Sequence, residues 1–213
     1  NTKTNKIGYV AAMGTDNSEV TSGIDAFALG IYSVNPQAQV YVKVTNSWYA
    51  PQKEEEAAKQ LLDMDCDVIA QHCDTSYPQT LAQERGVYSI GYNSDMSKNA
   101  PEACLCSVVW NWSAYYTTAV QSIIDGTWDG SNYYGGMSEN LVNVTSVANF
   151  ATAGTQEKVN EAKQQILTGK NGVFDGAIET NTGEIIGTAG STLDDATITG
   201  AMNWYFKTVN VVE

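Results

Sequence analysis

The first half of the chain alternates two patterns: short runs of β-branched and aromatic residues, and longer segments with helical periodicity. The short runs predict buried strands at 6–12, 39–44, 67–71, 87–92 and 103–109. Between them, apolar residues recur at helical spacing at 20–31, 52–64 and 78–85. A strand, a helix and a parallel strand within about 30 residues form a right-handed crossover unit. The alternation therefore predicts an α/β fold, a doubly wound parallel sheet with helices on both faces.

The second half is less regular, and a C-terminal β-hairpin is its clearest feature. Residues 173–178 and 185–188 flank the sequence ETNTGE, whose Asn-Thr-Gly suits a turn with a positive φ. A loop rich in Trp, Tyr and Gly occupies 127–136. The remaining expected elements are helices at 115–125, 156–167 and 194–199, a strand at 141–147 and a final apolar run at 202–212.

The charge of the chain argues against nucleic acid as a partner. It carries 11 Lys and Arg residues against 24 Asp and Glu residues, a formal net charge of −13 at pH 7. Such an acidic surface repels phosphodiester backbones and anionic headgroups. No stretch approaches the roughly 18 apolar residues that a membrane-spanning helix needs, so we expect no direct span.

The four cysteines predict neither a disulfide scaffold nor a metal site. They are too few for a scaffold at this length. Cys104 and Cys106 share one face of a predicted strand, and Cys73 follows the only histidine. Zinc sites need a second cysteine or histidine pair that this chain lacks, and buried free cysteines behave as small hydrophobes. We therefore predict no metal and no cofactor.

The residues that follow the predicted strands carry the candidate binding chemistry. In an open α/β sheet, ligands bind beyond the carboxyl ends of the strands. Here these positions combine aromatic rings, amides and acids and contain no Lys or Arg. Aromatic faces stack on a flat ring, and carboxylates or amides hydrogen-bond its edge, so the combination suits an uncharged heterocycle. The candidate ligand-binding residues are Trp48, His72, Asp74, Asn93, Asp95 and Trp110.

Four of these candidates also have a purely structural interpretation. Trp48 could cap the core beneath a loop, and Asp95 could be a helix N-cap or a turn former. His72 could be a packing residue, and Trp110 could belong to the core or to an interface. Each alternative stays open on the sequence alone.

No catalytic constellation is present, so we predict a binding protein and no catalytic residues. The nucleophile elbow Gly-x-Ser-x-Gly is absent, and one histidine without a suitable serine leaves no triad. No Gly-x-Gly-x-x-Gly follows a strand, and no phosphate-binding loop with its lysine occurs.

Several segments in combination resemble the basic membrane protein (BMP) family, the purine-binding lipoproteins that are substrate-binding components of ABC importers. The matching segments are 6–12, 19–20, 23–36 (GIDAFALGIYSVNP), 48–58, 66–76 (CDVIAQHCDTS), 91–96 (GYNSDM), 100–101, 107–116 (SVVWNWSAYY), 126–128, 134–136, 174–176, 181–183 and 202–205. The resemblance covers nearly the whole chain. It implies a type I periplasmic-binding fold, in which two α/β lobes hold a purine in the cleft between them, outside the cytoplasmic membrane and beside a permease.

The resemblance also implies roles for the candidate residues. Trp48 would stack on the base, Asp95 would hydrogen-bond its edge, and His72 and Asp74 would lie near it. Nucleoside-binding members carry a lysine where this chain has Trp110, which favours a free, adenine-like base over a nucleoside. One departure is Ala50, where the family has an aspartate that could cap a helix or contact the ligand.

Compared with the family, the chain is expected to be a fragment: residues 1–213 form a single α/β domain that corresponds to the second lobe. Residues 108–136 would then be a crossover segment that belongs to the missing first lobe. Its aromatic residues would face water, and an exposed apolar patch drives association. We therefore expect self-association, through a swap of residues 110–136 between two copies.

Two other functions are compatible with the same fold. One is the effector-binding domain of a transcription regulator. The other is a doubly wound enzyme acting on a small heterocycle, with Asp95 and His72 as acid and base.

Overall fold

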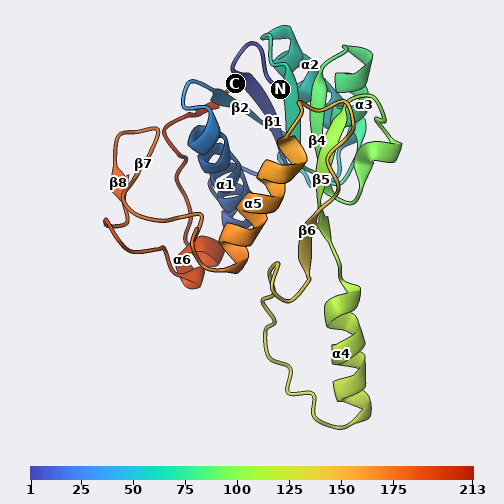
Figure 1. The fold of residues 1–213 in the computed structure, drawn as a ribbon, viewed down its shortest axis with the longest axis vertical. Coiled ribbons are helices and arrows are strands. Elements are labelled where there is room, and N and C mark those ends of the chain that lie inside the picture. The colour runs from blue at the N-terminus through green and yellow to red at the C-terminus, as the bar shows by residue number, and fades with distance from the viewer.

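A mostly parallel sheet forms the centre of the computed structural model, which describes all residues from Asn1 to Glu213 (Figure 1). Its strands are β1 (Lys6–Ala11), β2 (Gln39–Val44), β3 (Val68–His72), β4 (Tyr88–Asn93), β5 (Cys104–Trp110), β6 (Val142–Val144) and β9 (Val209–Val211). They pair in the order β6-β5-β4-β3-β1-β2-β9. All neighbouring pairs are parallel except β5 and β6. The doubly wound parallel sheet is confirmed, with one antiparallel strand added at its edge.

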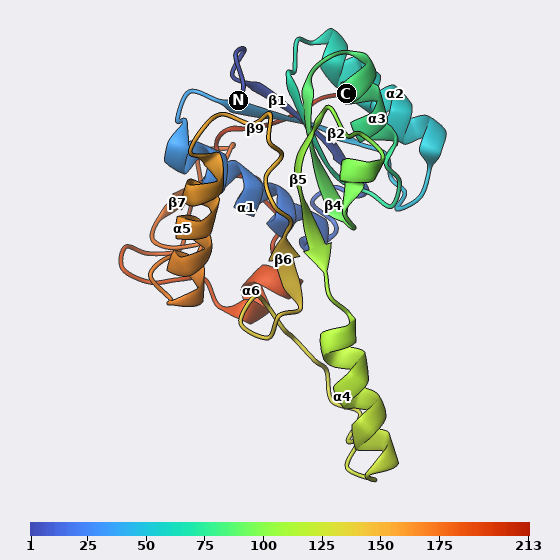
Figure 2. The ribbon, with the colours of Figure 1, turned by 45° about the vertical axis from the view of Figure 1, so that its right-hand side comes forward.

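Helices cover both faces of this sheet, as the crossover pattern predicts. The helices are α1 (Ser18–Val34), α2 (Pro51–Asp63), α3 (Tyr77–Glu84), α4 (Ser113–Ile124), α5 (Thr155–Leu167) and α6 (Asp195–Gly200), with a short 3-10 helix, η1 (Met96–Lys98). Figure 2 shows α1 on one side of the sheet and α2 with α3 on the other. None of these helices combines the length and apolarity needed to cross a bilayer.

Local sequence signals explain where the helices begin and end. The Asn17 side chain accepts a hydrogen bond from the Val20 amide and so caps the start of α1. Pro51 occupies the first turn of α2, where its missing N–H costs no hydrogen bond. Gly86, with a φ of +67°, follows α3 in the left-handed conformation that glycine adopts easily.

The core lies between β1–β3 and the two helical layers. One cluster of 24 buried residues joins the strands to α1, α2 and the segment before β9. The next largest cluster has 4 buried residues, so a single core dominates. Gly8 in β1 shows how tightly α2 packs, because a Cβ there would lie 3.0 Å from the Leu61 Cβ.

The second half of the chain packs less regularly than the first. The predicted C-terminal hairpin exists as β7 (Ile178–Glu179) and β8 (Ile185–Ile186), with strands much shorter than the sequence predicted. The strand expected at 141–147 is confined to β6.

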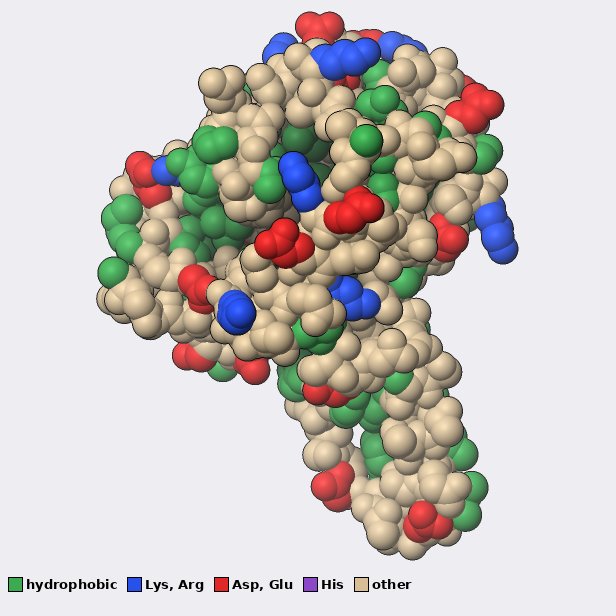
Figure 3. Space-filling model, viewed as in Figure 1, with side chains coloured by type: hydrophobic (Ala, Val, Ile, Leu, Met, Phe, Trp, Pro, Cys, Tyr) green, Lys and Arg blue, Asp and Glu red, His purple; other side chains and the backbone are tan.

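Helix α4 and the loop that returns from it form an arm that projects away from the body in both ribbon views (Figures 1 and 2). No residue of α4 is buried. In Figure 3 the arm shows hydrophobic and acidic side chains but no Lys or Arg. Its exposed apolar side chains include Trp112, Tyr116, Val120, Ile123, Ile124 and Trp128.

Candidate functional site

The six candidate residues lie at one edge of the sheet. Because β1 to β5 are parallel, their carboxyl ends share that edge. His72, Asn93 and Trp110 are the last residues of β3, β4 and β5. Trp48, Asp74 and Asp95 lie in the loops after β2, β3 and β4, respectively. The sequence expected all six beyond the strands, so three of them lie one position further inside the sheet than predicted.

An aromatic cluster surrounds His72. The centre of its ring lies 5.9 Å from the ring centre of Trp48, edge to face, and 4.2 Å from that of Tyr92 in β4. Trp48 is half-buried and packs against the main core. The indole therefore supports the core and still presents part of its surface at the edge of the sheet.

His72 itself is buried without a hydrogen-bond partner. Its residue is 5% exposed, and neither imidazole nitrogen has a partner within the protein. The ring fits because Gly23 in α1 has no side chain: a Cβ there would lie 2.8 Å from the His72 Nδ1. Burial lowers the pKa of His72 to about 4, so the imidazole is neutral at pH 7.

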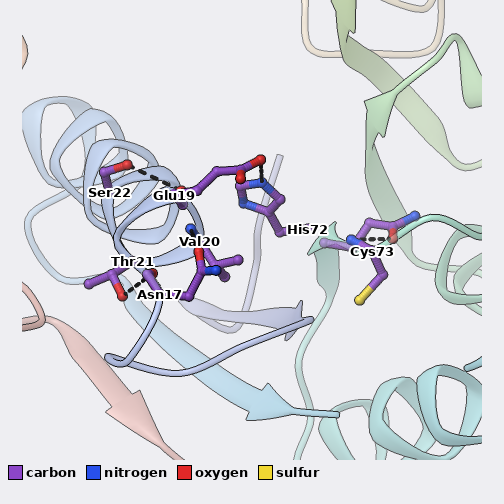
Figure 4. A network of polar contacts seen from close by, with 8 residues as sticks. Asn17, Glu19, Val20, Thr21, Ser22, His72 and Cys73 are labelled. Atoms are coloured by element: carbon purple, nitrogen blue, oxygen red, sulfur yellow. Dashed lines mark hydrogen bonds and ion pairs between the residues drawn. The ribbon is translucent and has the colours of Figure 1, made fainter. Parts of the chain in front are cut away.

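One carboxylate, that of Glu19, faces this imidazole, and Asp74 lies close enough to Glu19 to affect its pKa. Figure 4 shows Glu19, from the first turn of α1, reaching toward the His72 ring. The Glu19 Oε1 lies 4.0 Å from the His72 Nε2, too far for a hydrogen bond. Partial burial raises the pKa of the Glu19 carboxyl, and the negative charge of Asp74 raises it further. The phenol of Tyr92 has a pKa raised to about 12, chiefly by burial and also by these two acids.

Backbone and buried polar contacts hold the loops of Trp48 and Asp74 together. The Asp74 amide donates a hydrogen bond to the Trp48 carbonyl, 2.9 Å away. Beneath them, the carboxylate of Glu54 in α2 is fully buried. It accepts hydrogen bonds from the Ala50 amide at 2.8 Å and from the Thr75 hydroxyl. Glu54 thus satisfies the backbone N–H of Ala50, the N-cap residue of α2, whose own methyl side chain cannot accept a hydrogen bond from the first turn.

The three remaining candidates, Asp95, Asn93 and Trp110, make other contacts than the residues around His72. The exposed Asp95 accepts a hydrogen bond from the Ser97 amide at 3.0 Å and caps η1, which is the structural alternative that the sequence left open. Hydrogen bonds to Ser97 lower its pKa. Asn93 is exposed with a φ of +70°. Trp110 stacks on Trp112, with ring centres 5.4 Å apart, and so leads from the edge into the arm.

The structure adds two residues that the sequence did not single out, Glu19 and Tyr92. Glu19 was missed because it lies on a helix, several residues after β1 ends. Tyr92 was missed because it lies inside a strand whose pattern indicated only packing. Together with Trp48, His72 and Asp74 they form what we call the imidazole cluster. It offers aromatic faces, hydrogen-bond acceptors and no cation.

The sequence matches the family described as ABC transporter substrate-binding protein PnrA-like (Bmp) over residues 1–173. The chain belongs to this family. The BMP resemblance of the sequence is thereby confirmed, and the family is one of substrate-binding proteins, as expected for a chain without a catalytic constellation.

Two relatives are described by different ligands. A purine-binding protein of Brucella abortus is 37% identical over 203 residues, which cover 95% of this chain and 57% of the relative. A putative ABC transporter glucose-binding protein of Haloferax volcanii is 35% identical over 176 residues, covering 83% of this chain and 44% of the relative. The chain thus spans about half the length of these relatives.

Solved structures show the same fold. A solute-binding protein of an ABC transporter from Conexibacter woesei superposes with a TM-score of 0.60 at 19% identity, over 78% of this chain and 56% of that one. A transcriptional activator of the comK gene from Bacillus halodurans superposes with a TM-score of 0.68 at 20% identity, over 80% of this chain and 59% of that one. These likenesses confirm a lobe like that of periplasmic binding proteins.

Proposed function

We propose that this Bmp-family chain binds an uncharged purine base, adenine-like, as part of an extracytoplasmic substrate-binding protein of an ABC importer. The observation that carries the proposal is the imidazole cluster: a buried, neutral His72 with two unpartnered nitrogens, beside the Trp48 and Tyr92 rings. The purine-binding relative from Brucella abortus supports the same ligand class.

The chemistry of the cluster favours a neutral ring over a charged ligand. Stacking on an aromatic side chain contributes about 1–3 kcal/mol per base. Glu19 and Asp74 would repel a phosphate group, and no Lys or Arg of the cluster offsets that repulsion. A free base or nucleoside therefore fits better than a nucleotide. Trp110 at the end of β5, in place of the lysine that nucleoside-binding members carry, favours the free base.

We propose further that residues 1–213 form the second lobe of a two-lobe protein and that residues 108–136 are a crossover segment that packs on the first lobe. The absence of any buried residue in α4 supports this assignment. The imidazole cluster would then be one wall of a cleft, with closure of the lobes completing the pocket. The permease is the expected protein partner of such an assembly.

A sugar is the second candidate ligand, because a relative of similar identity is described as a putative glucose-binding protein. An aromatic face and carboxylates also suit sugar rings and hydroxyl groups. Because both a base and a sugar ring can pack on the Trp48 indole, direct comparison of the two ligands in one binding experiment separates the candidates.

Heteronuclear NMR titration with adenine, adenosine and glucose tests the proposal, since it detects the weak binding expected of a single lobe. We expect saturable shifts of the Trp48 indole N–H and of the His72 and Tyr92 amides with adenine, smaller shifts with adenosine and none with glucose. Trp48→Ala should abolish the response, whereas Trp128→Ala on the arm should leave it intact. Shifts with glucose alone, or no shifts at these residues, would reject the purine assignment.

A further inference from the structure

At the centre of the candidate site, the His72 nitrogens and the Glu19 carboxylate oxygens have no hydrogen-bond partner. Both His72 nitrogens are buried and unpartnered. A buried polar atom without a partner costs about 1–3 kcal/mol, so such an atom calls for an explanation. Packing alone does not supply one, because an apolar ring of similar shape would fill the space beside Gly23 without that cost.

The Glu19 side chain faces the same imidazole but stops short of it. Its Oε1 lies 4.0 Å from Nε2, and its side chain remains 61% exposed. No hydrogen bond ties the Glu19 carboxylate to another side chain, although Ser22 of α1 and the N-cap residue Asn17 lie nearby (Figure 4). The carboxylate is therefore free to accept hydrogen bonds from outside the protein.

We propose that Glu19 and His72 together recognise the edge of the bound ring. Glu19 accepts a hydrogen bond from a ligand N–H, and the His72 Nε2 forms a hydrogen bond with the adjacent ring atom. The pair thus selects a ring edge on which a hydrogen-bond donor stands next to a second polar atom. This inference rests on the proposed function and adds Glu19 as the specificity-determining residue.

The chemistry of the two groups defines which edge fits. An ionised carboxylate only accepts hydrogen bonds, and a neutral imidazole donates from one nitrogen and accepts at the other. The low pKa of His72 keeps it neutral at pH 7, so it can serve in either role. Adenine offers an exocyclic amino group beside a ring nitrogen, whereas unsubstituted purine has the ring nitrogen without the amino donor.

The test compares adenine with unsubstituted purine on the native chain, on Glu19→Gln and on the control Glu55→Gln, an equal charge change at an exposed site on α2. Dissociation constants come from NMR titration of the Trp48 indole signal. We expect the preference of the native chain for adenine over purine to fall about tenfold in Glu19→Gln, the size of a charge-assisted hydrogen bond. The control should keep the native preference.

The outcomes separate this inference from the proposed function. If adenine and purine both bind and Glu19→Gln leaves their ratio unchanged, the assignment of Glu19 is wrong and the binding site stands. If neither ligand moves the Trp48 signal of the native chain, the proposed function fails and this inference fails with it. The nitrogen chemical shifts of the His72 ring give a second readout, because adenine should move the Nε2 signal and purine should move it less.

Discussion

At the scale of single residues, Asp25 is a buried carboxyl whose ionisation the fold disfavours. This residue of α1 is fully buried; its Oδ1 accepts a hydrogen bond from the Phe206 amide at 2.8 Å, and its Oδ2 has no partner. Burial raises its pKa from the ordinary 3.8 to about 8, and the Phe206 amide lowers it only partly. The carboxyl is therefore largely protonated in the folded state at pH 7, whereas the unfolded chain ionises it.

Asp25→Asn should stabilise the protein at high pH. A carboxyl whose pKa is raised on folding contributes stability below about 4 that is lost as pH rises through about 8. Asparagine keeps the acceptor for Phe206 and cannot ionise, so the free energy of unfolding at pH 8 should rise by on the order of 2 kcal/mol. Urea unfolding at pH 5 and pH 8 measures the free energy of unfolding of the variant and of the native chain, with Glu55→Gln as the control. A variant less stable than the native chain at pH 8 would contradict the assignment.

His72→Phe should separate binding from stability. Phenylalanine keeps an aromatic ring between Trp48 and Tyr92 and removes two unpartnered nitrogens, so the free energy of unfolding at pH 7 should be unchanged or higher. Adenine binding should be lost. The native chain should also lose stability as pH falls from about 6.5 toward 4, because only the unfolded chain takes up the His72 proton there, and the variant should not. A destabilised variant that still binds adenine would show that His72 is a packing residue.

The sequence located candidate residues where their position in the sheet determined the environment. Trp48, His72 and Asp74 were expected at the carboxyl edge of the sheet, and the structure brings these three together. Their roles in ligand binding stay predictions. Tyr92 and Glu19 depended on contacts across strands and across the β1–α1 connection, which a linear pattern does not encode. The role of Asp95 in ligand binding stays a prediction, since its carboxylate is engaged by the Ser97 amide.

At the scale of elements, Glu54 links α2 to two loops of the candidate site. Its carboxylate accepts from Ala50 in the loop of Trp48 and from Thr75 in the loop of Asp74. Thr75→Val should leave one buried carboxylate oxygen unpaired and cost about 1–3 kcal/mol of unfolding free energy. It should also weaken adenine binding, because the two loops lose their shared anchor.

Thr75→Ser is the matched variant for this prediction, since it keeps the hydroxyl and removes only a methyl group. Thermal unfolding and NMR titration on both variants give the comparison. Equal stability and affinity in the valine and serine variants would show that Glu54 does not hold the loops.

The elements of the first half were predictable because local signals agree with the fold. Runs of β-branched residues, Pro51 and Gly86 predicted the strands and helices to within three residues. Pairing at the sheet edges was not predictable. β9 has three residues and joins β2 from the far end of the chain, and β6 turns antiparallel to β5 after the arm. Both pairings depend on long-range contacts that leave little pattern in so short a strand.

At the scale of the whole molecule, the arm is the feature that most affects solution behaviour. Helix α4 has no charged side chain, so two copies can meet along it without repulsion between like charges. We expect the chain to self-associate at micromolar concentration through residues 110–136. Tyr116→Lys combined with Ile123→Lys should shift it toward monomer, measured by light scattering.

The control for the arm is Val34→Lys at the end of α1, an apolar side chain that is 80% exposed but lies outside the arm. This variant should associate like the native chain. If the native chain stays monomeric, association through the arm is contradicted. The same holds if Val34→Lys shifts the chain toward monomer as much as the two arm substitutions do.

A crystal structure of the chain with adenine tests the central claim most directly. We expect the ring to stack on the Trp48 indole with its amino edge toward Glu19 and His72. A groove of about 280 Å³ lies between β6 and α5, and its lining includes Val144, Val159 and Ile166. Adenine bound in that groove, or anywhere away from Trp48 and His72, would contradict the account.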